Sequence, residues 1–187
     1  MKKIVKIVYI IVSILFLFYI GLPNQQFPEK LDDSIQSEEP ADTESLYRRA
    51  YFTNYSREEV LDHYVNEYLN DQKYYIKMPT YRLNYPPEEA QTIIRDQTRS
   101  TFLEEIVHPF RGSLFINGFE PKNDKDAIFI KGKPWKQKII VRQVGSNVYI
   151  RLLLGLATII LVPMIYIKLK LSLKEFTEGL AKIWIYR

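Results

Sequence analysis

The side chains best suited to chemistry gather in one stretch of the 187-residue chain. Glu104 and His108 are four residues apart there, so they would share one side of a helix. A carboxylate beside a histidine can support acid–base work. The same pattern also occurs on a solvated helix face crossed by ion pairs, so it assigns no catalytic residue. The complete polar cluster is Arg95, Asp96, Arg99, Glu104, Glu105, His108 and Arg111.

Other signatures of catalysis are missing from the sequence. The two histidines, His63 and His108, have no metal-binding spacing. The chain has no cysteine, which excludes disulfides, thiolate nucleophiles and cysteine-ligated metals. Its seven glycines form no cluster that could cradle a phosphate. We therefore expect no metal, no cofactor and no enzymatic activity.

Helices are expected to position the polar cluster. Pro87 and the two glutamates after it suit a first helical turn, and the apolar face then shifts along the segment. Residues 86–107 are therefore predicted to form one helix buried on different faces, or two helices. Ser56–Leu69 is a clearer helix, because Ser56 and Glu59 form a capping box before an apolar stripe.

Strand patterns surround these helices. Asn117-Gly118 and Gly132-Lys133-Pro134 are predicted turns, and Pro79 should mark an edge or a turn between short strands. The prediction is a small α+β domain over residues 46–147, with helices packed on an antiparallel sheet. The expected strands lie in Leu46–Tyr55, Gln72–Tyr85, Ser113–Asn117, Ala127–Lys131 and Lys138–Val144.

Two apolar runs flank this domain. Val148–Ile167 carries only Arg151, and a helix of its length is about 30 Å long, the thickness of a bilayer core. Residues 1–22 begin with lysines and continue into Ile4–Leu22, which is also long enough to span. No small-residue cleavage pattern follows Leu22. We therefore predict two transmembrane helices, although a cleaved signal peptide remains the alternative for the first run.

The distribution of charge gives the predicted orientation. Pro23–Asn147 holds 17 basic and 20 acidic residues, whereas the two ends together hold nine basic and two acidic residues. The positive-inside rule then places both termini in the cytoplasm and the middle domain outside the cell membrane. This location and the acidic domain argue against a nucleic-acid partner. Against this orientation stand the basic residues before the second span: Lys131, Lys133, Lys136, Lys138 and Arg142.

Two segments connect to the predicted spans. Residues 23–45 are rich in acids, proline, glutamine and serine, which predicts a flexible stalk or a docking segment. Residues 168–187 predict a basic amphipathic helix on the cytoplasmic lipid surface, or a partner helix in a membrane complex. The residues expected at the lipid surface are Lys170, Lys174, Phe176, Leu180, Lys182, Trp184 and Arg187.

Two long passages carry a resemblance. They are YPPEEAQTIIRDQTRSTFLEEIVHPFRGSLFINGFEP (Tyr85–Pro121) and QSEEPADTESLYRRAYFTNYSREEVLDHY (Gln36–Tyr64). Both resemble uncharacterised short two-span membrane proteins of small-genome, uncultivated bacteria. The resemblance implies a bacterial cell envelope, and it supplies no activity, ligand or site residue.

These patterns favour a non-catalytic function. The first expectation is an envelope scaffold or complex subunit that presents the extracytoplasmic domain to a protein partner. The second is a sensor or a binding module for a small molecule or peptide, which would require a concave apolar pocket. The third is an enzyme that uses Glu104, Glu105 and His108, which would require these side chains to converge in a cleft.

Overall fold

A computed structural model describes residues 3–71, 76–86 and 100–185. The chain forms two compact units. The helical unit comprises Met1–Pro23 and Asn147–Arg187, and the sheet unit comprises Asn24–Ser146. The chain therefore passes between the units twice, and each unit is considered by itself below.

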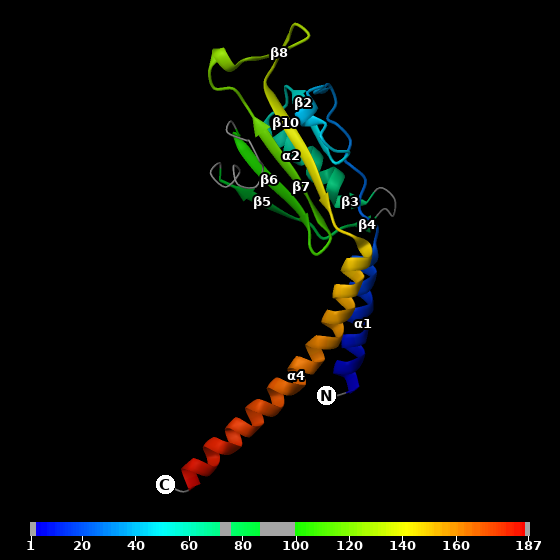
Figure 1. Ribbon diagram of the computed structural model, residues 1–187, viewed down its shortest axis with the longest axis vertical. Helices are drawn as coiled ribbons and strands as arrows, with labels where there is room; N and C mark the ends of the chain where they lie inside the picture. Colours follow the sequence, from blue (N-terminus) through cyan, green and yellow to red (C-terminus); the bar gives the residue numbers. More distant parts are fainter. Residues whose placement is uncertain (1–2, 72–75, 87–99, 186–187) are drawn as a thin grey trace. The chain divides into compact units, whose positions relative to one another are not determined.

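The sheet unit is built on a six-stranded antiparallel sheet with the order β1-β2-β10-β7-β6-β5 (Figure 1). The central strand β10 pairs with β2 on one side and β7 on the other. Because strands distant in sequence meet here, the sheet depends on the whole unit folding together. The strands are β1 (Ile35–Gln36), β2 (Arg48–Thr53), β5 (Tyr81–Tyr85), β6 (Phe102–His108), β7 (Gly112–Phe119) and β10 (Gln137–Gly145).

Shorter elements complete the unit. Strands β3 (Asn70–Asp71) and β4 (Ile76–Lys77) form one small antiparallel pair. Strands β8 (Ile128–Ile130) and β9 (Lys133–Trp135) form another, between β7 and β10. Two single-turn 3₁₀-helices are η1 (Pro40–Asp42) and η2 (Asp124–Asp126). Pro79 lies between β4 and β5, as predicted for a turn between short strands.

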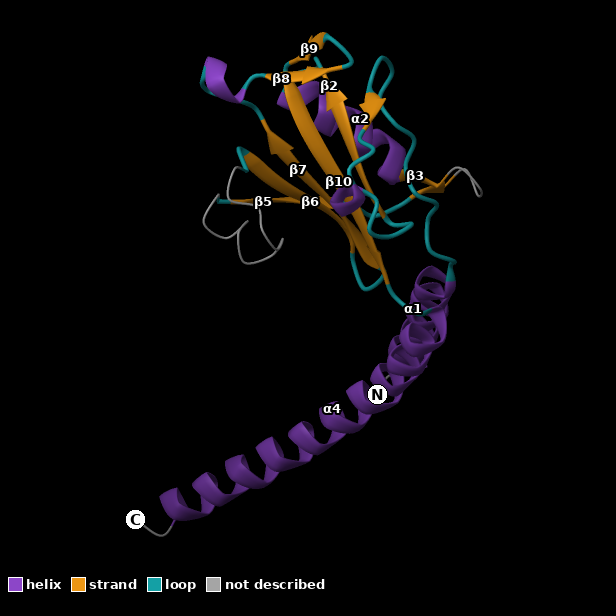
Figure 2. Cartoon of the chain, turned by 45° about the horizontal axis from the view of Figure 1, so that its top comes forward, coloured by secondary structure: helices purple, strands orange, loops and turns teal. Residues whose placement is uncertain are grey.

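The predicted capping-box helix is confirmed as α2 (Arg57–Leu69). Ser56 donates its backbone N–H to Glu59 Oε2 at 2.7 Å, and its hydroxyl accepts from the Glu59 backbone N–H at 3.4 Å. The hydrogen bond from the Ser56 backbone N–H, and a second one from the Ser56 hydroxyl to Glu59 Oε2 at 2.8 Å, hold the pKa of the Glu59 carboxyl below its usual value. The helix lies against one face of the sheet, which is visible in both ribbon views (Figures 1 and 2).

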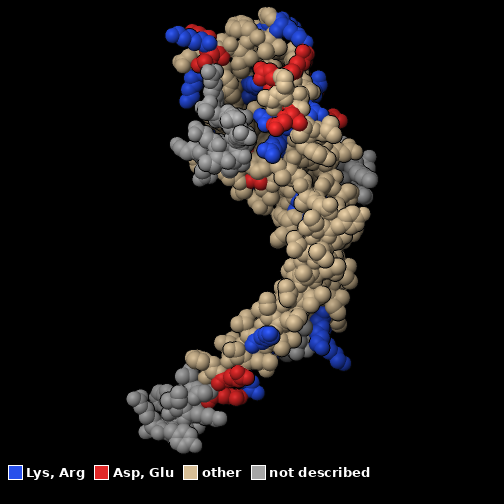
Figure 3. Space-filling view, in the orientation of Figure 1, with Lys and Arg blue, Asp and Glu red and all other residues tan. Residues whose placement is uncertain are grey.

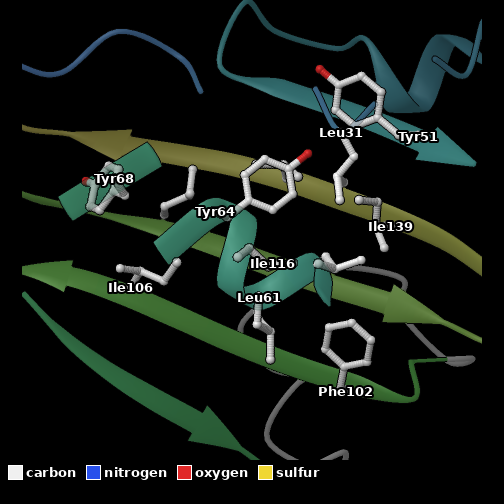
Figure 4. Close-up of a cluster of buried hydrophobic side chains, with 12 residues drawn as sticks. Leu31, Tyr51, Leu61, Tyr64, Tyr68, Phe102, Ile106, Ile116 and Ile139 are labelled. Carbon is white, nitrogen blue, oxygen red and sulfur yellow. The ribbon is translucent and has the colours of Figure 1, made fainter. Parts of the chain in front are cut away.

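The hydrophobic core lies between α2 and the sheet (Figure 4). Phe102 on β6 packs across Gly118 on β7, where an added Cβ would lie 1.9 Å from the Phe102 ring. Gly118 is therefore needed for close packing, not for a turn. The core residues are Leu31, Tyr51, Val60, Leu61, Tyr64, Tyr68, Phe102, Ile106, Leu114, Ile116, Ile139 and Val141.

The segment predicted as a flexible stalk, residues 23–45, differs from that expectation. All of it after Pro23 belongs to the sheet unit. Leu31 is buried in the core, β1 pairs with β2, and Asp42 is buried beside Lys138 at 2.7 Å. The acidic composition concealed these contacts because one buried leucine and a few paired charges are enough to hold the segment against the sheet.

The helical prediction for residues 86–107 is wrong where the structure describes it. Residues 87–99 lie outside the described chain, whereas Phe102–His108 forms strand β6. Six of its seven residues are buried, so both faces of the strand are covered. A strand covered on both faces loses the apolar–polar alternation that identifies strands in a sequence. Asn117-Gly118, predicted as a turn, lies inside β7.

The helical unit contains α1 (Lys3–Gly21) and α4 (Val148–Ile185). Both are long and apolar enough to be candidate membrane helices. They pack together, and α4 curves away from α1 toward its C-terminal end in both ribbon views (Figures 1 and 2). Helix α4 is continuous across Ile167–Lys168, so the predicted boundary between a span and a separate surface helix does not appear.

Tyr64 provides a test of the core. Its side chain is fully buried, and its hydroxyl has no hydrogen-bond partner among the residues that the structure describes. Burial raises the pKa of Tyr64 well above its usual value of 10.0 because it disfavours the phenolate. The pKa of Tyr64 is therefore higher in the folded state than in the unfolded state. The stability that the neutral Tyr64 phenol contributes is fully present below about pH 10, and it is lost as the pH rises toward the pKa of the folded state.

We expect Tyr64→Phe to leave Tm at pH 7 unchanged or higher, because it removes a buried hydroxyl without a partner. It should also reduce the loss of Tm above about pH 10, measured by thermal unfolding of the full chain in detergent. Burial raises the pKa of Tyr51 as well, so part of the alkaline loss should remain. Tyr47→Phe, at an exposed position, is the control. A larger alkaline loss in Tyr64→Phe would contradict the assignment.

Candidate functional site

The structure separates the polar cluster predicted from the sequence. Arg95, Asp96 and Arg99 lie outside the described residues. Glu104 and His108 share one face of β6, but residues four apart in a strand are about 13 Å apart. That separation exceeds hydrogen-bond reach, so the pairing expected for a helix does not form. Glu105 points to the opposite face of the same strand.

Glu104 forms a buried ion-pair group with two arginines. Its carboxylate is inaccessible to solvent and contacts Arg57 Nη2 at the start of α2. The Arg82 Nε atom on β5 lies 3.2 Å from its second oxygen. Arg57 also lies 5.0 Å from the centre of the Phe102 ring. Glu104 therefore connects α2 and β5 to β6 through two ion pairs, a structural arrangement in which both carboxylate oxygens are occupied.

His108 and Arg111 lie at the other end of β6, both buried. The His108 ring stacks on Tyr68 of α2 with ring centres 4.2 Å apart. The Arg111 carbonyl accepts a 2.6 Å hydrogen bond from the Ser146 hydroxyl. These contacts join the β6–β7 turn to the end of α2 and to the residue after β10.

A small polar pocket adjoins these residues. Gln143 donates its side-chain N–H to the Gln25 carbonyl at 2.8 Å, and Gln25 donates likewise to the Tyr68 carbonyl at 2.7 Å. The pocket volume is about 10 Å³, which is room for about one water molecule. This pocket is too small for a metabolite or a peptide side chain. Its lining residues are Asn24, Gln25, Tyr68, His108, Arg111, Gly112, Gln143 and Gly145.

Glu105 belongs to a separate group on the outer face of β6. It accepts a hydrogen bond from the Tyr85 hydroxyl of β5. Leu103 is buried on the same face and packs with Tyr85 and Phe115. Glu104, Glu105 and His108 therefore do not converge, as the predicted enzymatic site would require. Among the residues that the structure describes, no group of three or more histidine or acidic side chains could hold a metal ion.

A polar contact that the sequence did not reveal joins the two apolar helices. Pro163 has no N–H, so the carbonyl of Ile159, four residues earlier in α4, lacks its usual helical donor. The hydroxyl of Tyr9 in α1 donates to that carbonyl at 2.5 Å. In an apolar solvent an unpaired carbonyl costs several kcal/mol, so this contact matters most in a membrane. The sequence features that could have indicated this contact were Pro163 in one apolar run and Tyr9 in the other.

A second contact lies at the opposite end of the helix pair. Arg151 is buried, and its Nη2 donates to the carbonyl of Leu22 just after α1 at 2.9 Å. A cation at the C-terminal end of a helix also interacts favourably with the helix dipole. Between the two contacts, a Cβ at Gly155 would lie 2.3 Å from the end of the Ile20 side chain, so a larger residue there would require Ile20 to shift.

The C-terminal half of α4 presents basic and apolar side chains to solvent. Lys170, Lys174 and Phe176 are all exposed, and Lys174 lies 3.6 Å from Glu178. Leu180, Lys182 and Trp184 lie within α4, but their side chains fall outside the described residues, as does Arg187. Tyr9 meets Ile159 while Leu22 meets Arg151, so α1 and α4 run antiparallel within the helical unit. Basic side chains are visible on the lower part of this unit (Figure 3).

Comparisons with known proteins identify no relative. No family model, curated protein or solved structure matches the chain. The functional argument therefore depends on the geometry described above.

The role assigned to Glu104 can be tested by Glu104→Gln. This change keeps the shape and removes the charge held by Arg57 and Arg82, so we expect a loss of about 1–3 kcal/mol in the free energy of unfolding. Denaturant unfolding of the full chain in detergent provides the measurement. Glu120→Gln, in a half-exposed pair with Lys136, should change stability by less than about 0.5 kcal/mol. Equal stability of Glu104→Gln and the wild type would refute the role.

The helix-pair contact predicts a coupling between Tyr9 and Pro163. Tyr9→Phe should destabilise the pair by about 0.6–1.7 kcal/mol, the range for interhelical hydrogen bonds in membranes. In a Pro163→Ala background the cost should nearly vanish, because Ala at 163 supplies the N–H that Ile159 lacks. Unfolding in mixed micelles of increasing SDS content measures the cycle.

Tyr149→Phe is the matched control for this cycle, because Tyr149 is exposed on α4. It should have no effect in either background. An identical cost of Tyr9→Phe with and without Pro163 would show that the hydroxyl does not act through the Ile159 carbonyl.

Proposed function

We propose that this protein is a non-catalytic, membrane-anchored subunit or scaffold that presents the sheet unit to a protein partner outside the cytoplasm. The observation that carries the proposal is the position of the sheet unit's two ends. Asn24 and Ser146 are 122 residues apart in sequence, yet the Asn24 side chain donates to the Ser146 carbonyl at 3.0 Å. The chain continues from both ends directly into the apolar helices.

The helix pair supports membrane anchoring through both chain ends. Leu22 and Arg151, which lie close to the two chain crossings, are themselves hydrogen-bonded to each other. The contact of Tyr9 with α4 favours an uncleaved first helix, since a cleaved signal peptide would leave the Ile159 carbonyl without that donor. In this proposal α1 is a permanent half of the anchor.

The internal contacts of the sheet unit favour presentation over catalysis. Glu104, Glu105 and His108 are each held by neighbours on different strands or helices, and the polar pocket beside His108 has room for about one water. These groups stabilise the junctions between elements. The exposed surface of the unit remains available for a partner.

Orientation follows the positive-inside rule in this proposal, with both termini cytoplasmic. The exposed basic part of α4 then lies in the cytoplasm, where anionic lipid headgroups would attract its lysines. A helix of 38 residues is about 57 Å long, nearly twice the bilayer core. The part beyond the core therefore lies at or below the lipid surface.

Crosslinking in intact cells tests the proposed function. A membrane-impermeant, amine-reactive crosslinker should join lysines of the sheet unit to a partner protein, which mass spectrometry of the purified adduct would identify. The Lys30→Arg and Lys77→Arg variant, which lacks two exposed amine targets, should lose only the crosslinks at those positions. Recovery of the protein alone under all crosslinking conditions would count against a scaffold.

The orientation is checked in the same cells by single cysteines, since the natural chain has none. A cysteine at exposed Leu46 should react with an impermeant maleimide from outside. A cysteine at exposed Glu178 should react only after the membrane is permeabilised. The opposite labelling pattern would reverse the proposed orientation.

A further inference from the structure

The segment between β7 and β10 forms a fixed projection at one end of the sheet, which we name the basic hairpin (Pro121–Lys136). Its turn residues Lys131 and Gly132 have φ values of 51° and 76°, which is typical of a tight type I′ hairpin turn. At its base, the Lys136 backbone N–H donates to the Asn54 side chain at 2.9 Å. The next residue, Gln137, donates to the Tyr55 carbonyl at 2.7 Å. The hairpin is therefore held to the β2–α2 connection.

The charge of the basic hairpin is opposite to that of the rest of the sheet unit. It holds five lysines and two aspartates, a net charge of +3, whereas the remainder of Pro23–Asn147 has 12 basic and 18 acidic residues, a net charge of −6. Basic side chains at this end of the unit are visible in Figure 3. A local reversal of this size favours an anionic partner through electrostatic complementarity.

Most of these lysines are not engaged by acids. Lys122, Lys125 and Lys133 are exposed, and no ion pair connects them to an acid within the described residues. Lys131 lies 3.4 Å from Glu38, but both side chains are more than two-thirds exposed, so that pair is weak. Lys138, just beyond the hairpin, is different. It lies 2.7 Å from Asp42 and 2.8 Å from Glu39, and these acids raise its pKa despite its burial.

The basic hairpin also has an exposed apolar face. Phe129 on β8 and Pro134 on β9 are paired in register, so they share one face of the hairpin. Both are exposed, and the Phe129 side chain is 66% accessible. On the opposite face, Ile128 pairs with Trp135 and both are partly buried. The hairpin thus exposes an aromatic ring on a segment that also carries the exposed lysines.

We propose that the basic hairpin binds a polymer that carries repeated phosphate groups. The basic residues of the hairpin are all lysines, without one arginine. Lysine binds phosphate as a compact point charge, which suits phosphates distributed along a chain, whereas the planar fork of arginine is favoured for two-point recognition of a single carboxylate or phosphate group. The proposal deepens the proposed function and rests on it, because the hairpin must lie outside the cytoplasm to meet an envelope polymer.

Binding of inorganic polyphosphate to the full chain in nanodiscs made only of phosphatidylcholine tests the proposal, with poly-glutamate as the carboxylate probe. If about four phosphates are neutralised, the affinity for polyphosphate should fall roughly 50-fold between 50 and 200 mM salt. The Lys125→Gln and Lys133→Gln double variant should bind about tenfold or more weakly at low salt. Lys30→Gln with Lys77→Gln removes the same charge elsewhere on the sheet unit and should bind as the wild type does.

Three outcomes would overturn the proposal. Equal loss in the two double variants would show attraction to net charge alone, and tighter binding of poly-glutamate would indicate an acidic protein partner. Absence of polyphosphate binding by the wild type would exclude the site. Partner crosslinks that persist in the hairpin variant would leave the scaffold function standing without this site. Polyphosphate binding without any crosslinked protein would support the hairpin and remove the protein partner.

Discussion

The carbonyl oxygen of Ile159 imposes the constraint on which the helical unit depends. Pro163 removes its helical donor, and a lipid environment offers no water in exchange. The Tyr9 hydroxyl of α1 supplies the missing donor. Without α1, the Ile159 carbonyl of α4 would lack this hydrogen bond as long as proline occupies position 163. The same contact fixes how far α1 lies along α4. Gly155 of α4 allows the Ile20 side chain of α1 to approach closely, and Arg151 donates a hydrogen bond to the Leu22 carbonyl just after α1.

The same constraint governs the sheet unit, where the excluded solvent is the interior of the protein. Glu104 is fully buried on the core face of β6, and an isolated charge there would be costly. Arg57 and Arg82 reach it from α2 and β5 with stems that cross the edge of the core, while their side chains stay more than one-third exposed. One buried carboxylate therefore fixes the relative positions of three elements. In both units, a polar group without water specifies which segments pack together.

These polar requirements also explain which parts of the fold the sequence predicts. Helix α2 follows from local information, because the Ser56–Glu59 capping box and the apolar stripe lie within its own 13 residues. Strand β6 does not, because Glu104 and Glu105 look like solvated helix residues until the partners Arg57 and Tyr85 are known. Those partners are 47 and 20 residues away in sequence. Gly118 resembles a turn glycine for a similar reason, since only the Phe102 ring packed across it shows its role.

The candidate site was predictable to the same limited extent. The sequence identified the charged residues of β6, but it predicted that Glu104 and His108 would lie together only if the segment were a helix. In the strand, these two residues are about 13 Å apart. The two candidate membrane helices were easier to predict, because length and apolarity are local properties. The Tyr9 contact was not predictable in this way, since it joins residues 150 apart. Local patterns thus predicted α2 and the two apolar helices, whereas β6 and the contacts of Glu104 and Tyr9 depend on long-range partners.

The fold also bears on the charge pattern that opposes the predicted orientation. Lys131, Lys133 and Lys136 precede the second apolar helix by fewer than 20 residues, which would make them juxtamembrane if the chain between were compact. Strand β10 instead occupies most of that interval, and its nine residues extend about 30 Å from the basic hairpin to Gly145. Folded domains cross the membrane largely regardless of their charge, so lysines within the sheet unit carry less weight in the positive-inside rule. Their position on an ordered hairpin is consistent with the role proposed for them, as a contact surface for an anionic polymer.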